Sequence, residues 1–260
     1  MSAFIYDIGL HNGADTAHYL REGARVLAID ANPVMCAAAE ARFREQIRTG
    51  QLTIINRGVA ERVGQLEFWI CDDVSEWSSF QRNFAARNGA RHHAITVDCV
   101  PIIDVIAEFG RADYMKIDIE GNDRICIGGL TRASAPSYIS IEMDHGQGDE
   151  DIERLADLGY RGFKVICQND AWHQVTTANM WLYRFGPHHP LVRPLKRLRT
   201  GIAHRVHGRR AGESGPWGEK TSGSWHSVDH ARAVWRVLRE IDERLGTHGV
   251  GWWFDVHAKK

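Results

Sequence analysis

Hydrophobic and polar positions alternate in blocks along the first part of the chain. An apolar run at residues 4–8 is followed by a polar loop with Gly9 and Gly13, by an amphipathic segment, and by a second apolar run that ends on Asp30. Short apolar runs bounded by turn residues are typical of buried strands, whereas apolar positions three and four residues apart are typical of helices. The pattern therefore predicts a strand, a turn, a helix and a strand.

The same alternation continues to about residue 185 and predicts the rest of a sheet. Further strands are expected at residues 52–55, 66–70, 92–100, 114–117, 138–141, 162–167 and 178–185. Further helices are expected at residues 35–48, 102–109, 151–158 and 228–245. Because strands and helices alternate, we expect an α/β fold with a mostly parallel sheet, helices on both of its faces and an antiparallel final pair.

The composition changes after residue 186, and we expect a domain boundary there. The predicted division is a domain at residues 1–186 and a C-terminal extension at residues 187–260 that packs on it. The extension contains a basic run, a glycine-rich loop with two tryptophans, an amphipathic helix and an aromatic tail, at residues 193–210, 212–225, 228–245 and 250–256. Because the tail is too aromatic to be left in water, it should pack on the body or on a partner chain, so a homodimer through the extension is a further expectation.

Two segments of the extension have a second interpretation. The basic run at residues 193–210 has the charge of a nucleic-acid patch, but it lacks interleaved aromatic residues, so we expect a solvated or partly mobile segment. The loop at residues 212–225 is a candidate lid.

The composition as a whole is typical of a soluble globular protein. The chain has 260 residues, of which 43% are hydrophobic and 25% charged, and this length is sufficient to bury a full core. The formal net charge of −1 gives no global field that would attract nucleic acid or a membrane. No apolar run is long enough to cross a bilayer, and no signal sequence precedes the first strand, so we expect a cytoplasmic protein.

Neither the cysteines nor the histidines indicate a metal centre. The five cysteines are scattered without C-x-x-C spacing, which suits reduced, buried thiols better than disulfides or a zinc site. The adjacent pairs His92-His93 and His188-His189 would point to opposite faces of a strand and cannot readily chelate as units. No metal site is predicted, and Asp118, Glu120 and Glu142 are the better ligands if a divalent ion is used at all.

The first loop contains the residues that are expected to bind a nucleoside. Gly9 and Gly13 let the backbone turn sharply and approach a ligand closely, and Asp30 can accept hydrogen bonds from both hydroxyls of a ribose. From Asp7 to Thr16 the loop has the pattern D-x-G-x-x-x-G-x-x-T, and not the G-x-G-x-x-G of dinucleotide sites. An acidic start and two glycines suit a ligand with a cationic amine and no phosphate, such as S-adenosylmethionine. The alternative is that any α/β protein needs small residues at its first turn.

The second informative stretch is DYMKIDIEG, at residues 113–121. Asp118 and Glu120 follow a predicted strand at its C-terminal end, where open α/β sheets bind their ligands. Two neighbouring carboxylates are costly unless a cation, a proton or hydrogen-bond donors compensate for them, so a ligand site is favoured. The alternative is that Asp118 caps the next helix and that Glu120 pairs with Lys116 or Arg124.

Three further segments border this edge of the predicted sheet. The strand at residues 138–141 ends in Glu142 and is followed by His145, which is a candidate general base, although a polar loop often contains a histidine without a function. Residues 58–60 follow the third strand and should lie beside an adenine. Residues 75–89 form either a surface loop or a flap over the ligand.

Four segments together resemble the FkbM family of S-adenosylmethionine-dependent methyltransferases: DIGLHNGADT, LAIDANP, KIDIEG and PSYISIE, within residues 4–145. The family's first loop is nearer D-x-G-A-N-x-G, and here Leu10-His11-Asn12 occupies that region. The resemblance implies a seven-stranded Rossmann-like fold of class I methyltransferases. It also implies methyl transfer, most often to a hydroxyl oxygen of a sugar or a natural-product intermediate, and a small-molecule acceptor.

The resemblance also implies roles for individual residues. Asp30 would hold the ribose, and Asp118 would lie near the reacting centre, while the general base would be one of Glu120, Glu142 and His145. The methionine end of the cofactor would be held by Asp7, Gly9, Gly13 and Thr16, and the adenine would be flanked by Gly58, Val59 and Ala60.

Two other classes of function use the same first unit. An NAD-dependent oxidoreductase would also place Asp30 on a ribose, and a non-catalytic nucleotide-binding module would need no carboxylates at the strand end. Asp118 and Glu120 argue against the binding module. Neither nucleic acid nor a membrane is expected as a partner.

Overall fold

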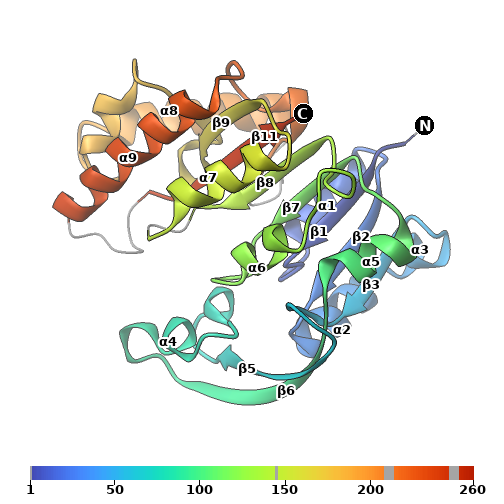
Figure 1. Cartoon of the computed structure of the whole chain (residues 1–260). Coiled ribbons are helices and arrows are strands. Elements are labelled where there is room, and N and C mark those ends of the chain that lie inside the picture. The colour runs from blue at the N-terminus through green and yellow to red at the C-terminus, as the bar shows by residue number, and fades with distance from the viewer. Residues whose placement is uncertain (1, 144–145, 208–213, 246–251) are drawn as a thin grey trace. The chain divides into compact units, whose positions relative to one another are not determined.

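The computed structural model of the protein describes residues 2–143, 146–207, 214–245 and 252–260 (Figure 1). By its internal contacts the chain divides into two compact units, Met1–Ser137 and Tyr138–Lys260. The domain boundary that we expected after residue 186 lies inside the second unit and stays a prediction.

Four parallel strands form the main sheet of the first unit, in the order β7-β1-β2-β3. They are β1 Phe4–Ile8, β2 Arg25–Asp30, β3 Leu52–Asn56 and β7 Tyr114–Ile117. Every residue of β1 and β7 is buried, as expected for parallel strands that are covered on both faces. The register pairs Asp7 of β1 with Lys116 of β7, so two polar residues lie side by side in the centre of the sheet.

The helices of the first unit connect these strands, and their bounds are α1 Ala14–Arg21, α2 Pro33–Arg42, α3 Arg44–Arg48, α5 Ile102–Phe109 and α6 Asp123–Gly128. Right-handed crossovers place α1 and α2 on one face of the sheet and α5, which precedes β7, on the other. The helix expected at residues 35–48 is interrupted at Phe43, whose φ of −109° and ψ of 28° are not helical. The buried ring of Phe43 packs against Gly13, and this contact accounts for the break.

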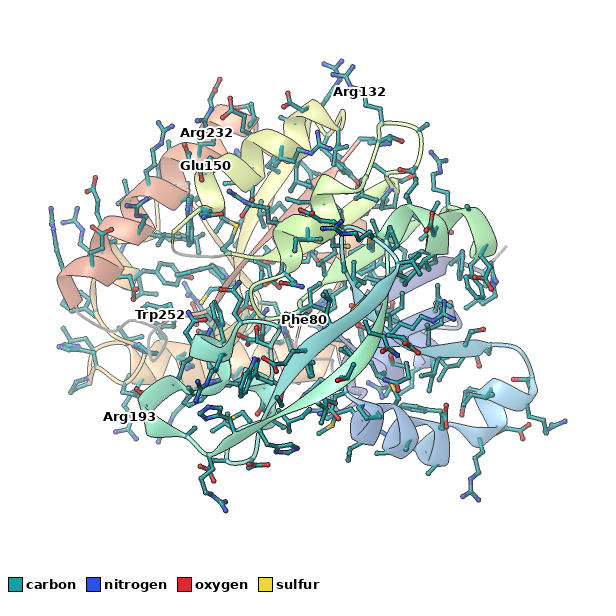
Figure 2. All side chains as sticks on the ribbon, turned by 60° about the horizontal axis from the view of Figure 1, so that its bottom comes forward. Phe80, Arg132, Glu150, Arg193, Arg232 and Trp252 are labelled. Atoms are coloured by element: carbon teal, nitrogen blue, oxygen red, sulfur yellow. The ribbon has the colours of Figure 1, made fainter. Side chains whose placement is uncertain are left out.

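A second, smaller sheet belongs to the first unit, with the strand order β4-β6-β5. Its strands are β4 Gly58–Val59, β5 Gly64–Cys71 and β6 His92–Val100. β5 and β6 form a long antiparallel ribbon, the lower curved ribbon in Figure 1. Phe68 on its inner side packs edge-to-face on Phe80, at 5.0 Å between ring centroids, and Phe80 is labelled in Figure 2.

The chain between β5 and β6 is residues 75–89, which we call the 75–89 segment. It contains three short helical turns, η1 Ser75–Trp77, α4 Arg82–Ala85 and η2 Arg87–Gly89. Backbone hydrogen bonds in both directions join Trp69 of β5 to Ser79 at 2.8 and 2.9 Å. The segment is therefore an ordered part of the first unit, and its role as a surface loop or as a flap stays a prediction.

The second unit has four strands in the order β10-β9-β11-β8, and its described pairings are antiparallel. The strands are β8 Tyr138–Glu142, β9 Gly162–Cys167, β10 His173–Val175 and β11 Phe254–Lys259. The strand expected at residues 178–185 is wrong, because this stretch contains the 3-10 helix η4 Met180–Arg184. Met180 and Tyr183 are three residues apart and both buried, which is the spacing of a 3-10 turn and not of a strand.

The aromatic tail supplies a strand of the second unit. β11 lies between β9 and β8, and Phe254, Val256 and Ala258 are buried there. The first unit has four strands in its main sheet and the second unit has four, which makes eight where we expected seven. The predicted α/β class with a mostly parallel central sheet is confirmed.

The helices of the second unit are η3 Gln168–Asp170, η5 Gly218–Lys220, α7 Gly148–Asp157, α8 Arg193–His207 and α9 Val228–Leu245. α9 has the bounds that its apolar spacing predicts. Asp149 of α7 accepts paired hydrogen bonds from both Arg232 and Arg236 of α9 at 2.8–3.1 Å, and Arg232 lies beside α7 in Figure 2. The basic run forms α8 as far as residue 207.

The glycine-rich loop is fixed to the sheet of the second unit through Glu219. The Glu219 carboxylate accepts hydrogen bonds from Tyr138 Oη at 3.0 Å, Trp225 Nε1 at 2.8 Å and Lys259 Nζ at 2.9 Å. Thr221 accepts a hydrogen bond from the buried Lys164 of β9 at 2.9 Å. The proposed lid function of this loop stays a prediction.

Candidate active site

The first loop folds over the end of β2 and against the end of β7. Gly9 N and Leu10 N both donate to the Ile29 carbonyl, at 2.9 and 3.1 Å. Gly9 has a φ of +94°, and a Cβ built there would lie 1.8 Å from the backbone oxygen of Asp118. Only glycine satisfies both conditions. The first loop, which is expected to hold the methyl donor, therefore touches the backbone of Asp118.

Asp7 and Thr16, which we expected to contact the ligand, face the protein interior. Thr16 Oγ1 donates to Asp7 Oδ2 at 2.5 Å, and neither residue has any exposed surface. Their bond ties the end of β1 to the first turn of α1. In this structure they hold the loop in place from behind, and their expected contact with the ligand stays a prediction.

Lys116 is a buried cation at the centre of this region. Its Nζ lies 3.5 Å from Asp7 and from Asp15 and 3.4 Å from Asp118, and it donates to the Gly9 carbonyl at 2.9 Å. Burial acts to lower the pKa of Lys116, but the three carboxylates outweigh it and raise the pKa well above its usual value. Burial raises the pKa of Asp7 to about 6, against the opposing effect of Lys116.

The sequence suggests Lys116 only as a partner of Glu120. In the structure Lys116 pairs with Asp118 instead. The available signal was a lysine inside a short, buried strand, since an ammonium group in the interior requires counter-charges.

Asp30 is half-buried at the end of β2, as predicted. Its two oxygens accept hydrogen bonds from the backbone N–H groups of His11 at 2.7 Å and Asn32 at 2.8 Å. Burial raises the pKa of Asp30, although both hydrogen bonds act to lower it. A carboxylate has about four acceptor positions, so each oxygen retains capacity for a ribose hydroxyl.

His11 links the first loop to the 75–89 segment and was not identified as a site residue from the sequence. Its φ is 44°, a left-handed conformation that is uncommon outside glycine. The ring Nε2 lies 2.8 Å from Ser75 Oγ, whereas the buried Nδ1 has no hydrogen-bond partner within the described residues. The departure of this loop from the family pattern at Leu10-His11-Asn12 was the available signal.

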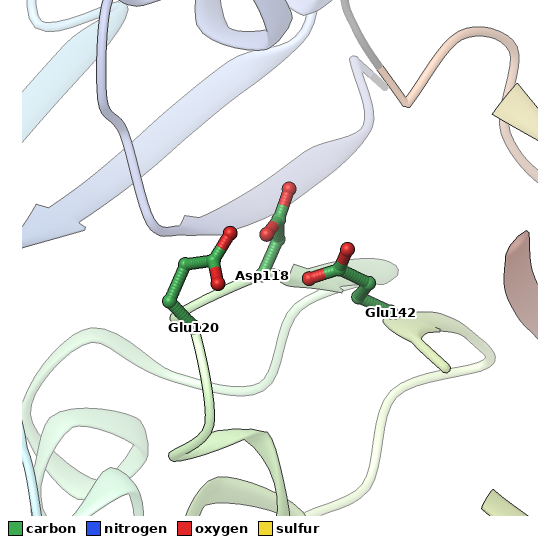
Figure 3. A group of neighbouring side chains, drawn as sticks. All are labelled: Asp118, Glu120 and Glu142. Atoms are coloured by element: carbon green, nitrogen blue, oxygen red, sulfur yellow. The ribbon is translucent and has the colours of Figure 1, made fainter. Parts of the chain in front are cut away.

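Asp118 and Glu120 both lie in the loop after β7 (Figure 3). The Asp118 side chain is 26% exposed and pairs with Lys116, and Glu120 pairs with Arg87 of the 75–89 segment at 3.2 Å. The interpretation of Asp118 as a helix cap is wrong, because Asn122 occupies the N-cap position of α6. Both carboxylates thus lie just after the end of a strand, where open α/β sheets bind their ligands.

The electrostatics of this loop favour the protonated form of its buried acids. Burial raises the pKa of Glu120 to about 8, and the charge of Asp118 adds to this effect, while Arg87 opposes it. Burial also raises the pKa of Asp123 to about 7, again with a contribution from Asp118. A group whose pKa lies near neutrality can accept and release a proton under ordinary conditions.

The 75–89 segment holds the turn that carries Glu120. Ser79 Oγ donates to the Glu120 carbonyl at 2.6 Å, and Gln81 Nε2 donates to the Gly121 carbonyl at 2.9 Å. Glu120 itself has a φ of 42°. These bonds fix an unfavourable backbone conformation, a feature that clusters at ligand sites, so they support the interpretation of the segment as a flap.

Residues 58–60 also border this loop, because Asn122 Nδ2 donates to the Val59 carbonyl at 3.4 Å. Gly58 has no room for a side chain, since a Cβ there would lie 2.3 Å from the ring of Phe80. The structure brings Gly58, Val59 and Ala60 into the same unit as Asp30, and Asn122 was not identified from the sequence. Their expected contact with adenine stays a prediction.

The remaining two candidates come from the second unit. Glu142 is the last residue of β8, opposite Asp255 of β11 in the register, and it is drawn in Figure 3. His145 lies outside the described residues. Their expected roles stay predictions.

Comparison with known proteins identifies the family. The sequence profile of the methyltransferase FkbM domain matches residues 7–164, which is more than half of the chain. The chain belongs to the FkbM methyltransferase family. The predicted family is confirmed, and with it the cofactor S-adenosylmethionine. A search of curated proteins found no match.

Several solved methyltransferase structures are similar to this chain at low TM-scores. A methyltransferase FkbM from Methylobacillus flagellatus is 18% identical with a TM-score of 0.38, over 54% of this chain and 32% of that one. A precorrin-6y C5,15-methyltransferase from Geobacter metallireducens is 12% identical with a TM-score of 0.42, over 100% and 80%. An S-adenosylmethionine-dependent O-methyltransferase from Thermotoga maritima has the same identity and TM-score, over 100% and 59%. The chain thus spans about a third of the M. flagellatus protein.

The residues of the FkbM site fit the methyl donor. S-adenosylmethionine has a ribose, an ammonium group and a sulfonium, and so needs hydroxyl acceptors and negative charge. Asp30 supplies acceptor positions, while Asp7, Asp15 and Asp118 outnumber their common cation Lys116. No helix in the described part of the chain is long and apolar enough to span a bilayer.

Proposed function

We propose that this FkbM domain transfers the methyl group of S-adenosylmethionine to a hydroxyl oxygen of a small acceptor of the sugar or natural-product class. The observation that carries the proposal is the position of two sets of carboxylates. Asp30 lies at the end of β2, and Asp118 and Glu120 follow the end of β7, two strands that flank β1 in one parallel sheet. The carboxyl ends of such strands form the ligand-binding edge of an open α/β sheet.

The cofactor would be held by the first loop and by Asp30. Asp30 accepts the ribose hydroxyls, and the backbone of Gly9 and Gly13 faces the methionine end. Asp7 and Thr16 act from behind this loop, because their side chains are buried and bonded to each other. Residues 58–60 flank the adenine.

The reaction would need mainly alignment and a route for one proton. S-adenosylmethionine, when bound, supplies a methyl group that is already electrophilic. Glu120 accepts the proton of the acceptor hydroxyl, since its pKa of about 8 is close to that of an efficient general base near neutrality. Asp118 pairs with Lys116, and an acidic side chain at this position favours a cationic donor over a neutral one. Glu142 and His145 are the other candidates for the base.

The 75–89 segment would contribute to the acceptor side of the site. It holds the Glu120 turn through Ser79 and Gln81, and Arg87 lies 4.0 Å over the ring of Phe84. These contacts support a flap that positions a small molecule. Location in the cytoplasm and a homodimer through the C-terminal extension are further parts of the proposal.

The deciding experiment first compares the binding of S-adenosylhomocysteine with that of NAD and then measures methyl transfer. Isothermal titration calorimetry should show binding of S-adenosylhomocysteine and no measurable binding of NAD. Incubation of the protein and S-adenosylmethionine with a panel of sugars and phenols should then give products heavier by one methylene in mass spectrometry. Tight NAD binding without S-adenosylhomocysteine binding would instead establish an oxidoreductase. Methylation confined to amines would retain the methyltransferase and remove the oxygen acceptor.

A further inference from the structure

The outer face of α8 carries a row of exposed apolar side chains. Leu198, Ile202 and Val206 are 62%, 53% and 68% exposed, and Leu191 just before the helix is 71% exposed. Residues four positions apart in a helix lie above one another, so the three helical residues form a continuous stripe. Nothing in the described structure covers this stripe. An uncovered apolar stripe is unusual on a solvent-facing helix.

The opposite face fixes α8 to the second unit. Arg199 forms an ion pair with Asp170, whose side chain is only 1% exposed, and Asp170 also accepts a hydrogen bond from Tyr183 at 3.1 Å. Val192 and Ala203 are buried on the same side. The helix is therefore held in one orientation, and its exposed stripe is a fixed feature of the surface.

The charge of α8 has a single sign. Residues 193–207 include five arginines and lysines and no aspartate or glutamate. Arg197 directly precedes Leu198 of the stripe, and Arg205 directly precedes Val206. Each arginine therefore lies about a quarter-turn from the stripe, on the side that faces away from Arg199. Both are exposed. The face thus has an aliphatic centre and an arginine border.

We propose that this face of α8 binds the surface of an anionic phospholipid membrane. Leu198, Ile202 and Val206 would enter the boundary between headgroups and acyl chains, and Arg197 and Arg205 would contact lipid phosphates. A helix with an apolar stripe and a basic border lies in the plane of such an interface. Anionic lipids also supply the negative charge that α8 itself lacks.

Two other occupants fit the face less well. A second copy of the chain, paired through the same face, would bring like arginines together without any acid on the helix to compensate for them. A nucleic acid would meet the arginines but would leave three aliphatic side chains against polar phosphates. Our expectation of no membrane partner relied on the net charge of −1, and this average conceals the local charge of α8.

Sedimentation with lipid vesicles tests the proposal. The wild-type protein should pellet with vesicles of phosphatidylcholine and phosphatidylglycerol, but not with phosphatidylcholine alone, and added salt should weaken the binding. Each arginine should contribute roughly fivefold to the partition, so Arg197→Glu with Arg205→Glu should weaken it by at least tenfold. Leu198→Glu with Ile202→Glu should do the same. The matched control is Arg62→Glu with Val63→Glu, an exposed arginine and valine of the first unit, which should bind as wild type.

A fluorescent label reports which face is in contact. The five native cysteines are all buried, so Ile202→Cys provides a single accessible thiol for a polarity-sensitive dye. Its emission should shift to the blue with anionic vesicles, whereas dye at Val63→Cys should not respond. Wild-type protein that stays in the supernatant overturns the proposal, as does binding to a DNA duplex with no binding to vesicles. A dimer in light scattering that the α8 variants dissociate, again without vesicle binding, assigns the face to a second copy instead.

Discussion

The ammonium group of Lys116 lies within 3.5 Å of the carboxylates of Asp7, Asp15 and Asp118, and its side chain is 5% exposed. Removing one partner of a buried ion pair costs more than the pair itself contributes, because the remaining charge stays without compensation. Here one cation compensates for three acids, all of which lie in the segments DIGLHNGADT and KIDIEG. The position of Asp118 and the shape of the first loop therefore both depend on Lys116.

Replacing this lysine should destabilise the protein strongly at neutral pH. We expect Lys116→Met to lower the free energy of unfolding by about 3–5 kcal/mol at pH 8, measured by urea unfolding. The loss should be smaller at pH 5, because Asp7, with its pKa raised to about 6, is then protonated. Arg48→Met is the control, since its ion pair with Glu45 is largely exposed and is expected to contribute little to stability. A loss in Lys116→Met no larger than in the control would contradict this account.

The pKa of Glu120 gives a prediction for activity. If Glu120 is the base, methyl transfer should rise with pH through about 8, where half of the carboxylate is ionised, and should level off above this range. Glu120→Gln should slow transfer by about 10²–10⁴-fold and remove this pH dependence. Its affinity for S-adenosylhomocysteine, measured by calorimetry, should change little. A Glu120→Gln enzyme that retains the profile would move the assignment to Glu142 or His145.

The same group affects stability in the opposite direction. Between its unfolded value of 4.5 and its folded value of about 8, Glu120 holds a proton in the folded protein and not in the unfolded chain. Stability therefore falls as the pH rises through this range. Glu120→Gln should remove that part of the dependence and should be more stable than wild type at pH 9. Chemical denaturation at pH 6 and pH 9 provides the comparison.

Among the turns, Gly9 combines two constraints. Its φ is +94°, and a Cβ would lie 1.8 Å from the Asp118 backbone oxygen. We expect Gly9→Ala to destabilise the protein by about 2–3 kcal/mol or more and to abolish S-adenosylhomocysteine binding, because the loop must move away from β7. Gly50→Ala separates the two effects. Gly50 also has a positive φ, of 74°, but nothing lies within 4 Å of its built Cβ.

The control should lose only about 1 kcal/mol and should bind as wild type. Thermal unfolding and calorimetry on both variants measure the difference. Equal effects of the two substitutions would show that backbone strain alone matters at Gly9, and that its contact with the Asp118 backbone does not.

The elements of the first unit could be predicted from the sequence because their signals are local. Strand β1 and helix α5 follow from apolar runs and from flanking glycine and proline, and the acids at the strand ends follow from the same pattern. The break at Phe43 could not be predicted, since it depends on a ring that packs against a glycine thirty residues earlier in the chain. His11 and Ser75 likewise meet only in the folded protein, across 64 residues.

The second unit was harder to predict because its sheet is assembled from distant segments. The apolar stretch at residues 178–185 has strand-like composition, but the available place in the sheet is taken by β11. The basic run at residues 193–210 contains no acidic residue that could pair with its arginines. In the structure α8 is held by the ion pair between Arg199 and Asp170, which are 29 residues apart. Non-local pairings of this kind are not visible in hydrophobic periodicity.

The region of the chain that matches the FkbM profile does not coincide with either of the two compact units. The FkbM profile covers residues 7–164 and thus continues past the division after Ser137, into strands β8 and β9 of the second unit. Those two strands are joined by β11, which comes from the end of the chain, beyond the matched region. The family domain is therefore completed by a segment that the family profile does not contain.

Deleting residues 254–260 tests this dependence. The deletion removes the hydrogen bonds of β11 to both neighbours and the burial of Phe254 and Val256, each worth about 1.5–3 kcal/mol, from a total stability on the order of 5–15 kcal/mol. We expect trypsin to degrade the second unit rapidly while a fragment near residues 1–137 persists in mass spectrometry. Removal of Lys260 alone, which is exposed, should leave the digestion unchanged. If the shortened chain resists trypsin as well as wild type does, β8 and β9 pair without β11, and the C-terminal extension is an addition to the FkbM domain and not a part of its sheet.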